Sequence, residues 1–211
     1  MSSENLETRE RILKAALDLL QAGRGQGVRM SDIARRAGLS RQAVYLHFPT
    51  RAELLIAATH HLDGLLDVEA RLRPSRTAGS GVERLEAYIA AWGAYIPEIY
   101  AMAKALLAMR DSDAAAAEAW DRRMQDMREG CAAAIDALVR DGMLAPGQTP
   151  EQATDLLWTL LSVRNWEQLT QACGWPQDRY VAAMQATARR LFVAESAPAA
   201  RRPQRNSSPA K

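Results

Sequence analysis

The chain has 211 residues, of which 48% are hydrophobic and 25% are charged. This ordinary globular balance excludes wholesale disorder, and the length allows one domain or two modest ones. Two cysteines, Cys131 and Cys173, are too few for a disulfide framework and favour a reducing compartment. The longest stretch without a charged side chain, residues 87–97, has about half the length that a membrane-spanning helix needs. The first residues lack the basic and apolar regions of a signal peptide, so we expect a soluble protein of the cytoplasm.

The formal net charge of +2 is unevenly distributed along the chain. Residues 1–60 carry a net charge of +3 and residues 61–195 a net charge of −5, whereas the tail 196–211 has four basic residues and no acidic one. A basic head on an acidic body suggests that the head alone approaches a polyanion.

Apolar residues recur with the period of an α-helix through nearly the whole chain, and no run alternates as a β-strand does. We therefore predict an all-α fold of about nine helices. In chain order, these helices span residues 8–22, 31–37, 41–47, 50–70, 82–96, 99–109, a long helix through 120–138 that ends at Gly142, 150–173 and 177–194.

Turn and cap residues mark several of these helix ends. Gly23 closes the first helix, and Thr149 begins a helix with Pro150 at its first position. Residues 73–81 are rich in Pro, Gly and Ser and are predicted to form a flexible loop. Pro97 is expected to break or kink the helical pattern, because it lacks an amide donor. In the helix that Thr50 caps, the predicted inner face consists of Leu55, Ala58, Leu62 and Leu65.

Residues 31–48 have the spacing of a helix-turn-helix. Gly38 stands where the chain must turn sharply, because a residue without Cβ adopts the left-handed conformation at little cost. Ser40 is a good cap for the second helix. The alternative is a helical corner with solvated arginines and no role in DNA binding. The residues expected to pack the two helices together are Ile33, Ala34, Ala37, Leu39, Val44 and Phe48.

In this geometry the second helix exposes side chains suited to DNA. Arg41 offers a fork to guanine O6 and N7, and Gln42 pairs with adenine N6 and N7. Ala43 and Leu46 are candidates for contact with a thymine methyl group. The candidates for phosphate contacts are Ser40, Tyr45, His47, Thr50 and Arg51.

Four segments of this region, Asp32–Ala34, Ala37–Ser40, Val44–Arg51 and Glu53–Leu55, carry a specific pattern. Through them, residues 8–56 resemble the N-terminal domain of the tetracycline-repressor-like (TetR/AcrR) family of bacterial transcriptional regulators. The resemblance implies a homodimer, usually a repressor, that a small molecule releases from a palindromic operator. It also implies that Arg41, Gln42 and Ala43 stand at base-contacting positions and that the five phosphate candidates grip the backbone.

The chain is predicted to have three parts, the first two of them from the resemblance. Residues 1–55 form a three-helix DNA-binding domain, and residues 56–195 form a helical domain for effector binding and dimerisation. The third part, residues 196–211, is predicted from its composition to be a disordered basic tail, because it has three prolines, four basic residues and no apolar residue larger than alanine. The tail adds nonspecific attraction to DNA or acts only as a solubilising extension.

The chain departs from the family pattern at a few positions. The family usually has Ser or Thr near position 29, where this chain has Arg29; the helix cap then moves to Ser31, or the phosphate contact passes to Arg29. Both Arg29 and Ser31 are therefore added to the candidates for phosphate contacts. Position 51 is often lysine, and Arg51 keeps the charge while adding a fork. The link formed by residues 23–27 is unusually rich in glycine.

The resemblance implies that the two C-terminal helices pair with their symmetry mates as a four-helix bundle, and the helices 150–173 and 177–194 are assigned to that dimer interface. Apolar residues occupy several sides of the first of them, so it needs more than one partner; the alternative is a central helix buried inside a monomer. Aromatic and methionine residues outside the head predict a pocket for a small apolar or aromatic effector, and the alternative is plain helical core. The pocket candidates are Trp92, Tyr95, Tyr100, Met102, Trp120, Met124, Met127, Trp158, Arg164 and Trp166.

No catalytic constellation is found in the sequence, and we expect neither enzyme activity nor a cofactor. His60, Asp63 and Asp67 have a spacing that could bind a metal ion, but such residues along a helix usually form a solvated face, so we expect no metal site. Cys131 lies on an apolar stripe and is expected in the core, whereas Cys173 is the better redox candidate. Two other functions stay open: a helix-turn-helix protein without an effector, and an enzyme or carrier with a vestigial motif.

Overall fold

The computed structural model describes residues 3–22 and 28–195. The predicted disordered tail, the glycine-rich link and Gly23 lie outside the described residues. In the described part the fold is all-helical, and no helix there is long and apolar enough to cross a lipid bilayer. Its elements are α1 (Ser3–Ala22), α2 (Met30–Ala37), α3 (Arg41–His47), α4 (Arg51–Leu65), α5 (Val68–Arg76), α6 (Gly81–Met109), α7 (Ala114–Arg140), α8 (Pro150–Leu160), α9 (Val163–Glu167), the π-helical turn η1 (Gln168–Ala172) and α10 (Gln177–Phe192).

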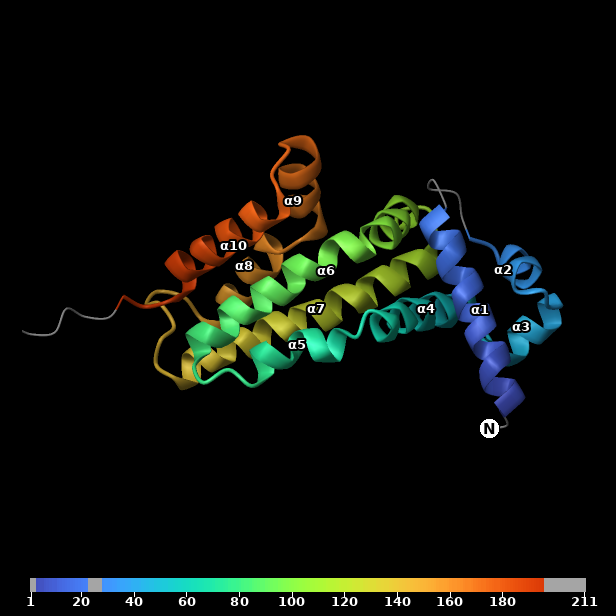
Figure 1. Ribbon diagram of the computed structural model, residues 1–211, viewed down its shortest axis with the longest axis horizontal. Coiled ribbons are helices and arrows are strands. Elements are labelled where there is room, and N and C mark those ends of the chain that lie inside the picture. Colours follow the sequence, from blue (N-terminus) through green and yellow to red (C-terminus); the bar gives the residue numbers. More distant parts are fainter. Residues whose placement is uncertain (1–2, 23–27, 196–211) are drawn as a thin grey trace, which may run out of the picture.

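The molecule is elongated, with α1, α2 and α3 at one end and the remaining helices forming a larger body (Figure 1). Helix α4 leaves the small end and runs into the body, where it packs along α7. The long helices α6 and α7 form the centre of the body, and α8, α9 and α10 cover its other side. Helix α4 therefore belongs to both parts of the molecule.

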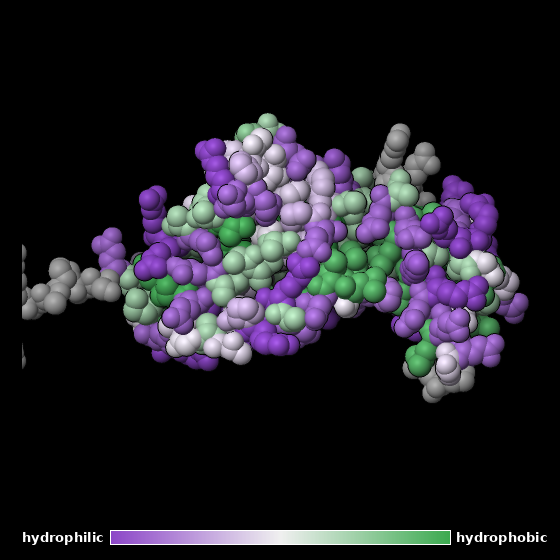
Figure 2. Space-filling model, in the orientation of Figure 1, coloured by the Kyte–Doolittle hydropathy of each residue, from purple (hydrophilic) through white to green (hydrophobic). Residues whose placement is uncertain are grey.

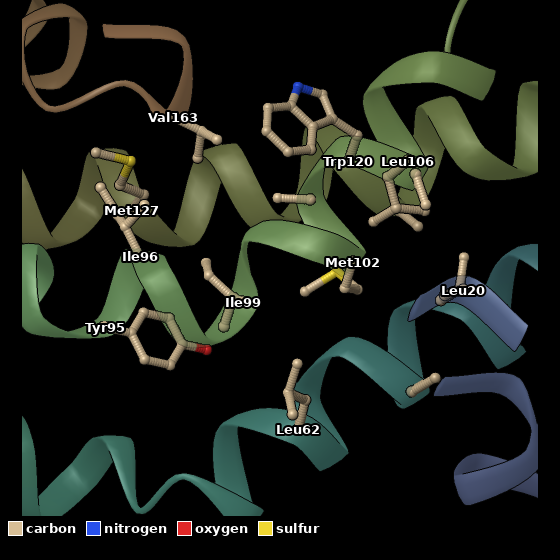
Figure 3. Close-up of a cluster of buried hydrophobic side chains, with 14 of the residues drawn as sticks. Leu20, Leu62, Tyr95, Ile96, Ile99, Met102, Leu106, Trp120, Met127 and Val163 are labelled. Atoms are coloured by element: carbon tan, nitrogen blue, oxygen red, sulfur yellow. The ribbon is translucent and has the colours of Figure 1, made fainter. Parts of the chain in front are cut away.

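A continuous apolar core connects the two parts. Leu20 of α1 and Leu62 of α4 lie with Met102 of α6 and Trp120 of α7 in one cluster (Figure 3). Such a core transmits displacements, because side chains packed at crystal-like density have little free space into which to yield.

The predicted helix of residues 50–70 was wrong in its length. Helix α4 ends at Leu65, and Asp67 adopts the left-handed conformation (φ 49°) while its side chain caps α5 by accepting a hydrogen bond from the Ala70 amide. Leu65, predicted on the inner face, is 65% exposed because the helix ends there. An aspartate that bonds its own following turn competes with continuation of the helix.

The prediction of a loop over residues 73–81 was also wrong, because residues 73–76 are helical. Helix α5 continues to Arg76 with Pro74 inside it, and only residues 77–80 separate it from α6. The lost amide donor of Pro74 costs one helical bond. Buried Ser75 fixes this turn of α5 onto α6 by donating its hydroxyl to the Arg84 carbonyl at 3.0 Å.

Pro97 does not break the helical pattern, because α6 is one helix of 29 residues. The amide that Pro97 lacks would have bonded the Gly93 carbonyl. That carbonyl instead accepts a hydrogen bond of 2.6 Å from Nε2 of Gln177, at the start of α10. A side chain distant in sequence therefore replaces the missing donor.

The predicted helix 150–173 is interrupted. The capping box at Thr149 begins α8 as predicted, but α8 ends at Leu160 and the Ser162 side chain caps a new helix. Asn165 donates to the Thr159 and Leu160 carbonyls, and Trp92 Nε1 donates to the Leu161 carbonyl at 2.7 Å. These bonds satisfy the backbone at the break, so a buried interruption costs little.

An added methyl group is expected to have opposite effects on the free energy of unfolding at two of the glycines. At Gly81, the first residue of α6, a Cβ would lie 2.6 Å from the carbonyl carbon of Ala137 in α7. We expect Gly81→Ala to lower the free energy of unfolding by about 2 kcal/mol, because backbone atoms cannot move aside cheaply. Gly64 lies inside α4, where an added Cβ would meet no atom within 4 Å, so Gly64→Ala should raise that free energy by about 0.5–1 kcal/mol. Urea unfolding measures both, and equal effects would contradict the close helix contact.

Candidate nucleic-acid interface and effector cavity

Helix α3 presents a polar surface at the small end of the molecule. Arg41 and Gln42 are exposed in its first turn, and Leu46 is 82% exposed, whereas Val44 is fully buried. Hydrophilic side chains predominate over α2 and α3 on the face shown in Figure 2. A helix buried on one side and open on the others is free to enter a DNA groove.

The turn before α3 has the predicted geometry. Gly38 has φ 67°, the Leu39 amide bonds the Ala34 carbonyl, and Ser40 Oγ accepts from the Ala43 amide at 3.1 Å. Thr50 caps α4 in the same way, accepting from the Glu53 amide at 3.1 Å. Because each hydroxyl oxygen uses one acceptor site for its cap, its O–H remains able to donate to a phosphate.

Predicted DNA-contacting residues from three helices line one surface hollow of about 380 Å³. These predicted residues are Arg29, Ser31, Arg41, Tyr45 and Arg51, and Met30 completes the lining. Within it, Arg41 Nη2 lies 3.3 Å from the Tyr45 hydroxyl, and the guanidinium lies 5.5 Å from the centroid of that ring. The hollow is lined by three arginines and by the exposed Tyr45, so its surface suits the phosphate groups of a DNA backbone.

The N-terminus of α2 settles one alternative left open by the sequence. Arg29 occupies the cap position without a side-chain bond to the helix, and Ser31 lies inside the first turn. The cap therefore does not move to Ser31. Helix α2 begins with amide groups that no side chain caps, and such amides attract anions.

Arg51 is tied into the protein rather than free. Its Nη1 donates to the Val28 carbonyl at 2.9 Å, and its Nη2 bonds the carboxylate of Asp113. Asp113 also caps α7 by accepting from the Ala115 and Ala116 amides. This ion pair joins the first residue of α4 to the start of α7. Of the other DNA candidates, Ala43 and His47 are half-buried.

A cavity of about 230 Å³ lies between α4, α5, α6 and α7. Its walls combine three aromatic rings with aliphatic groups and several charges. Tyr88 donates to the Met127 carbonyl at 3.0 Å, and the ring centroids of Trp92 and Tyr95 lie 5.8 Å apart. The lining residues are Asp63, Val68, Arg71, Leu72, Arg76, Tyr88, Ala91, Trp92, Tyr95, Arg123, Asp126, Met127 and Gly130.

The wall of this cavity contains a hydrogen-bonded triad formed by the buried Arg123 and Tyr95 and the partly buried Asp63. Arg123, whose side chain is 7% exposed, donates to the two carboxylate oxygens of Asp63 at 2.8 and 3.2 Å and to the Tyr95 hydroxyl. The Tyr95 hydroxyl donates to Asp63 in turn. Burial opposes the charge on Arg123, but the hydrogen bond to Asp63 and the neighbouring charges outweigh it and raise its pKa. Burial raises the pKa of Tyr95, so the guanidinium stays charged and the phenol stays neutral.

The DNA-binding region matches a known family. The family described as bacterial regulatory proteins of the tetR family matches residues 12–58, which include the whole helix-turn-helix. The transcriptional regulator CymR of Pseudomonas putida is 25% identical over 175 residues, which are 82% of this chain and 83% of CymR. The chain belongs to the tetR family. It is thus a DNA-binding transcriptional regulator of a family that is not enzymatic.

Further relatives of this tetR-family chain agree with that assignment. The regulator SrpR of Pseudomonas putida is 43% identical over 56 residues, 26% of each chain. A regulator from Saccharomonospora viridis, solved in complex with choline, has a TM-score of 0.68 at 18% identity over 90% of this chain and 99% of its own. FadR from Bacillus subtilis, solved with stearoyl-CoA, has a TM-score of 0.68 at 14% identity over 85% of this chain and 96% of its own. At these identities the two structures show the shared fold alone.

Three of the ten pocket candidates, Trp92, Tyr95 and Met127, line the cavity of this tetR-family regulator. Tyr100 and the exposed Arg164 line a separate hollow of about 120 Å³ between α6 and α9. The other five lie in neither: Met102, Trp120 and Trp166 are buried, and Met124 and Trp158 are half-buried against the core.

Sequence reasoning missed Arg123 as a pocket residue. Its signal was available, because Arg123 stands three residues after Trp120 and four before Met127, on the buried stripe of α7. An arginine at a core-facing position requires an acidic partner, and the partly buried Asp63 supplies it.

The three residues considered for metal binding each interact with a different group instead of with one another. Asp63 bonds Arg123, His60 lies 3.1 Å from Asp126, and Asp67 caps α5. Residues 3–22 and 28–195 contain no group of histidine, cysteine and acidic side chains that could hold a metal ion. Cys131 is buried, as predicted, and burial raises its pKa to about 12.

Proposed function

We propose that the chain is a homodimeric repressor that leaves a palindromic operator when a small apolar or aromatic effector occupies the cavity between α4 and α7. The observation that carries this proposal is the position of α4. Its first residue borders the DNA-binding hollow, and its last turn supplies Asp63 to the cavity wall. One helix thus has contact with both sites.

Helix α4 is held to α7 at three points along its length. Arg51 pairs with Asp113, His60 lies 3.1 Å from Asp126, and Asp63 pairs with Arg123. An effector that alters the wall at Asp63 changes the balance between two positions of α4, and hence the separation of the two recognition helices in a dimer. Because the proteins solved with choline and with stearoyl-CoA share the fold, they show that this architecture accommodates ligands.

The dimer is assigned to α8 and α10, which lie within the ranges 150–173 and 177–194 predicted for it. Leu156 on α8 is 49% exposed and Leu191 on α10 is 42% exposed. Ala182 and Ala186 are exposed on α10 and allow a close approach of another helix. Two half-sites a helical turn apart multiply the sequence discrimination of one short recognition helix.

A footprinting experiment tests this proposal on the promoter DNA that the purified protein retains. We expect protection of a two-fold symmetric site, with affinity falling steeply as salt rises. Sedimentation should give twice the chain mass of 23.2 kDa. Leu156→Glu should lower dimer formation and operator affinity together. Leu65→Glu, which changes an exposed leucine on α4 outside the proposed interface, should change neither. Protection of one asymmetric half-site would refute the dimeric repressor.

The second candidate function is a DNA-binding regulator without an effector. It predicts a tightly packed body, and the cavity of about 230 Å³ favours the effector-binding alternative. A screen in which no small molecule changes operator binding would support the second candidate.

A further inference from the structure

We infer that the effector is a single-ring organic carboxylate whose anionic group is bound by Arg123. This inference rests on the proposed function, because it names the chemical class of the ligand for the same cavity. It goes beyond an apolar or aromatic effector, since it assigns a charge, a size and a recognition residue.

The volume of the cavity limits the size of the ligand. An engineered cavity of about 150 Å³ binds benzene. The cavity here, at about 230 Å³, therefore has room for one ring with a short substituent, and several fused rings or a long acyl chain would extend beyond it. Tyr88, Trp92 and Tyr95 supply ring faces and edges, and Val68 and Leu72 supply aliphatic wall.

The hydrogen-bond partners of the charged lining residues determine the sign of the ligand charge. Both lining carboxylates are already bonded: Asp63 to Arg123 and Tyr95, and Asp126 to His60 and Arg122. Neither carboxylate needs a cationic ligand. By contrast, the buried Nε of Arg123 has no hydrogen-bond partner within the described residues. The unsatisfied group on this wall is therefore a cationic donor, which an anionic acceptor satisfies.

Two further arginines strengthen this preference. Arg71 and Arg76 of α5 also line the cavity, and both are partly exposed to solvent. They pair with Glu98 and Glu69, which are not lining residues, so each arginine is a lining residue and its acidic partner is not. An ammonium group placed among the three aromatic rings would instead stand near Arg123 without an unpaired carboxylate to receive it.

Binding of a carboxylate to Arg123 also explains how the ligand acts on α4. Asp63 lies on α4 and Arg123 lies on α7, so their ion pair is one of the ties between these helices. Asp63 uses the Nη1 and Nη2 donors, so a ligand carboxylate that accepts from Nε shares the same positive charge and places a second negative charge beside Asp63. The tie nearest the cavity weakens, and α4 becomes free to shift relative to α7.

Calorimetric titration of the full-length protein tests this inference with probes matched in shape. The probes are phenylacetate, its neutral counterpart phenylacetamide and the cationic 2-phenylethylammonium, each at one pH and salt concentration. We expect phenylacetate to bind at least about tenfold more tightly than phenylacetamide, because a charged acceptor strengthens the hydrogen bond to arginine. We expect the cation to bind more weakly than both.

Two substitutions locate the binding. Arg123→Lys keeps the charge but removes the Nε donor and the fork, and it should weaken phenylacetate binding about tenfold while leaving phenylacetamide nearly unchanged. Arg122→Lys is the matched control at the adjacent position, which is exposed and does not line the cavity. It should leave binding of all three probes unchanged. Circular dichroism establishes that each variant is folded.

The charge preference of the unmodified protein decides the inference even if Arg123→Lys does not fold. Equal or tighter binding of the amide or the cation, or no binding of any probe, would overturn it. Operator binding measured with the same probes separates this inference from the proposed function. If phenylacetate binds through Arg123 but leaves operator affinity unchanged, the carboxylate site stands and the proposed release fails. If only the neutral or cationic probe releases the operator, the regulator stands and the carboxylate assignment is wrong.

Discussion

Replacement of Arg41 and Gln42 by alanine is expected to lower affinity for the specific operator by at least about a hundredfold. Each side chain that pairs with a base by two hydrogen bonds contributes about 1–3 kcal/mol of discrimination, and a dimer uses each of them twice. Both residues are exposed in the first turn of α3, so their removal leaves the core intact. Fluorescence anisotropy with operator duplex and with a scrambled duplex at the same salt concentration measures the change.

The control for this substitution is Arg140→Ala. Arg140 is exposed at the far end of α7, in the body of the molecule, so its loss changes the net charge equally without touching α3. We expect Arg140→Ala to leave operator affinity nearly unchanged. Neither this control nor the double variant at Arg41 and Gln42 should melt more than a few degrees below the unmodified protein. A double variant that still prefers the operator over the scrambled duplex would show that α3 does not read the bases.

The helix-turn-helix was predictable from sequence because its determinants are local. The positive φ of Gly38, the cap made by Ser40 and the cap made by Thr50 each involve residues within three positions along the chain. Local geometry of this kind follows from residue type and spacing, so α2 and α3 were predicted to within one residue.

The errors in the body have the opposite origin. Pro97 remains inside α6 because Gln177, 84 residues away from Gly93, replaces the missing donor. The break after α8 is stabilised by Trp92, 69 residues from Leu161. No pattern within one helix reveals such partners, and propensity yields to tertiary contacts of this kind.

The cavity was only partly predictable for a related reason. Aromatic and methionine residues are equally suited to a pocket and to a close-packed core, so composition placed Trp92 and Trp120 together although only Trp92 lines the cavity. The charged residue on a buried stripe, Arg123, is the more specific signal, because a buried charge is costly unless it has a defined partner.

Replacement of Asp113 by alanine is expected to destabilise the protein by about 2–4 kcal/mol and to reduce the effect of an effector on operator binding. Asp113 caps α7 and pairs with Arg51, so alanine removes a cap worth about 1 kcal/mol and leaves a half-buried guanidinium without its acid. Coupling between two sites is typically a 5- to 150-fold change in affinity, about 1–3 kcal/mol. Since this pair fixes the DNA-binding end of α4 to α7, we expect most of that coupling to disappear.

A less severe variant, Asp113→Asn, separates the two roles of this residue. Asparagine is a good helix cap but carries no charge, so it should retain most of the stability and still lose the coupling. Asp121→Asn is the control, because Asp121 forms an exposed pair with Arg110 on the same helix. Urea unfolding gives the stability, and operator titrations with and without a bound effector give the coupling. If Asp113→Asn keeps the full effector response while Asp121→Asn behaves like the unmodified protein, the displacement does not pass through the Arg51–Asp113 pair, and the pair only stabilises the fold.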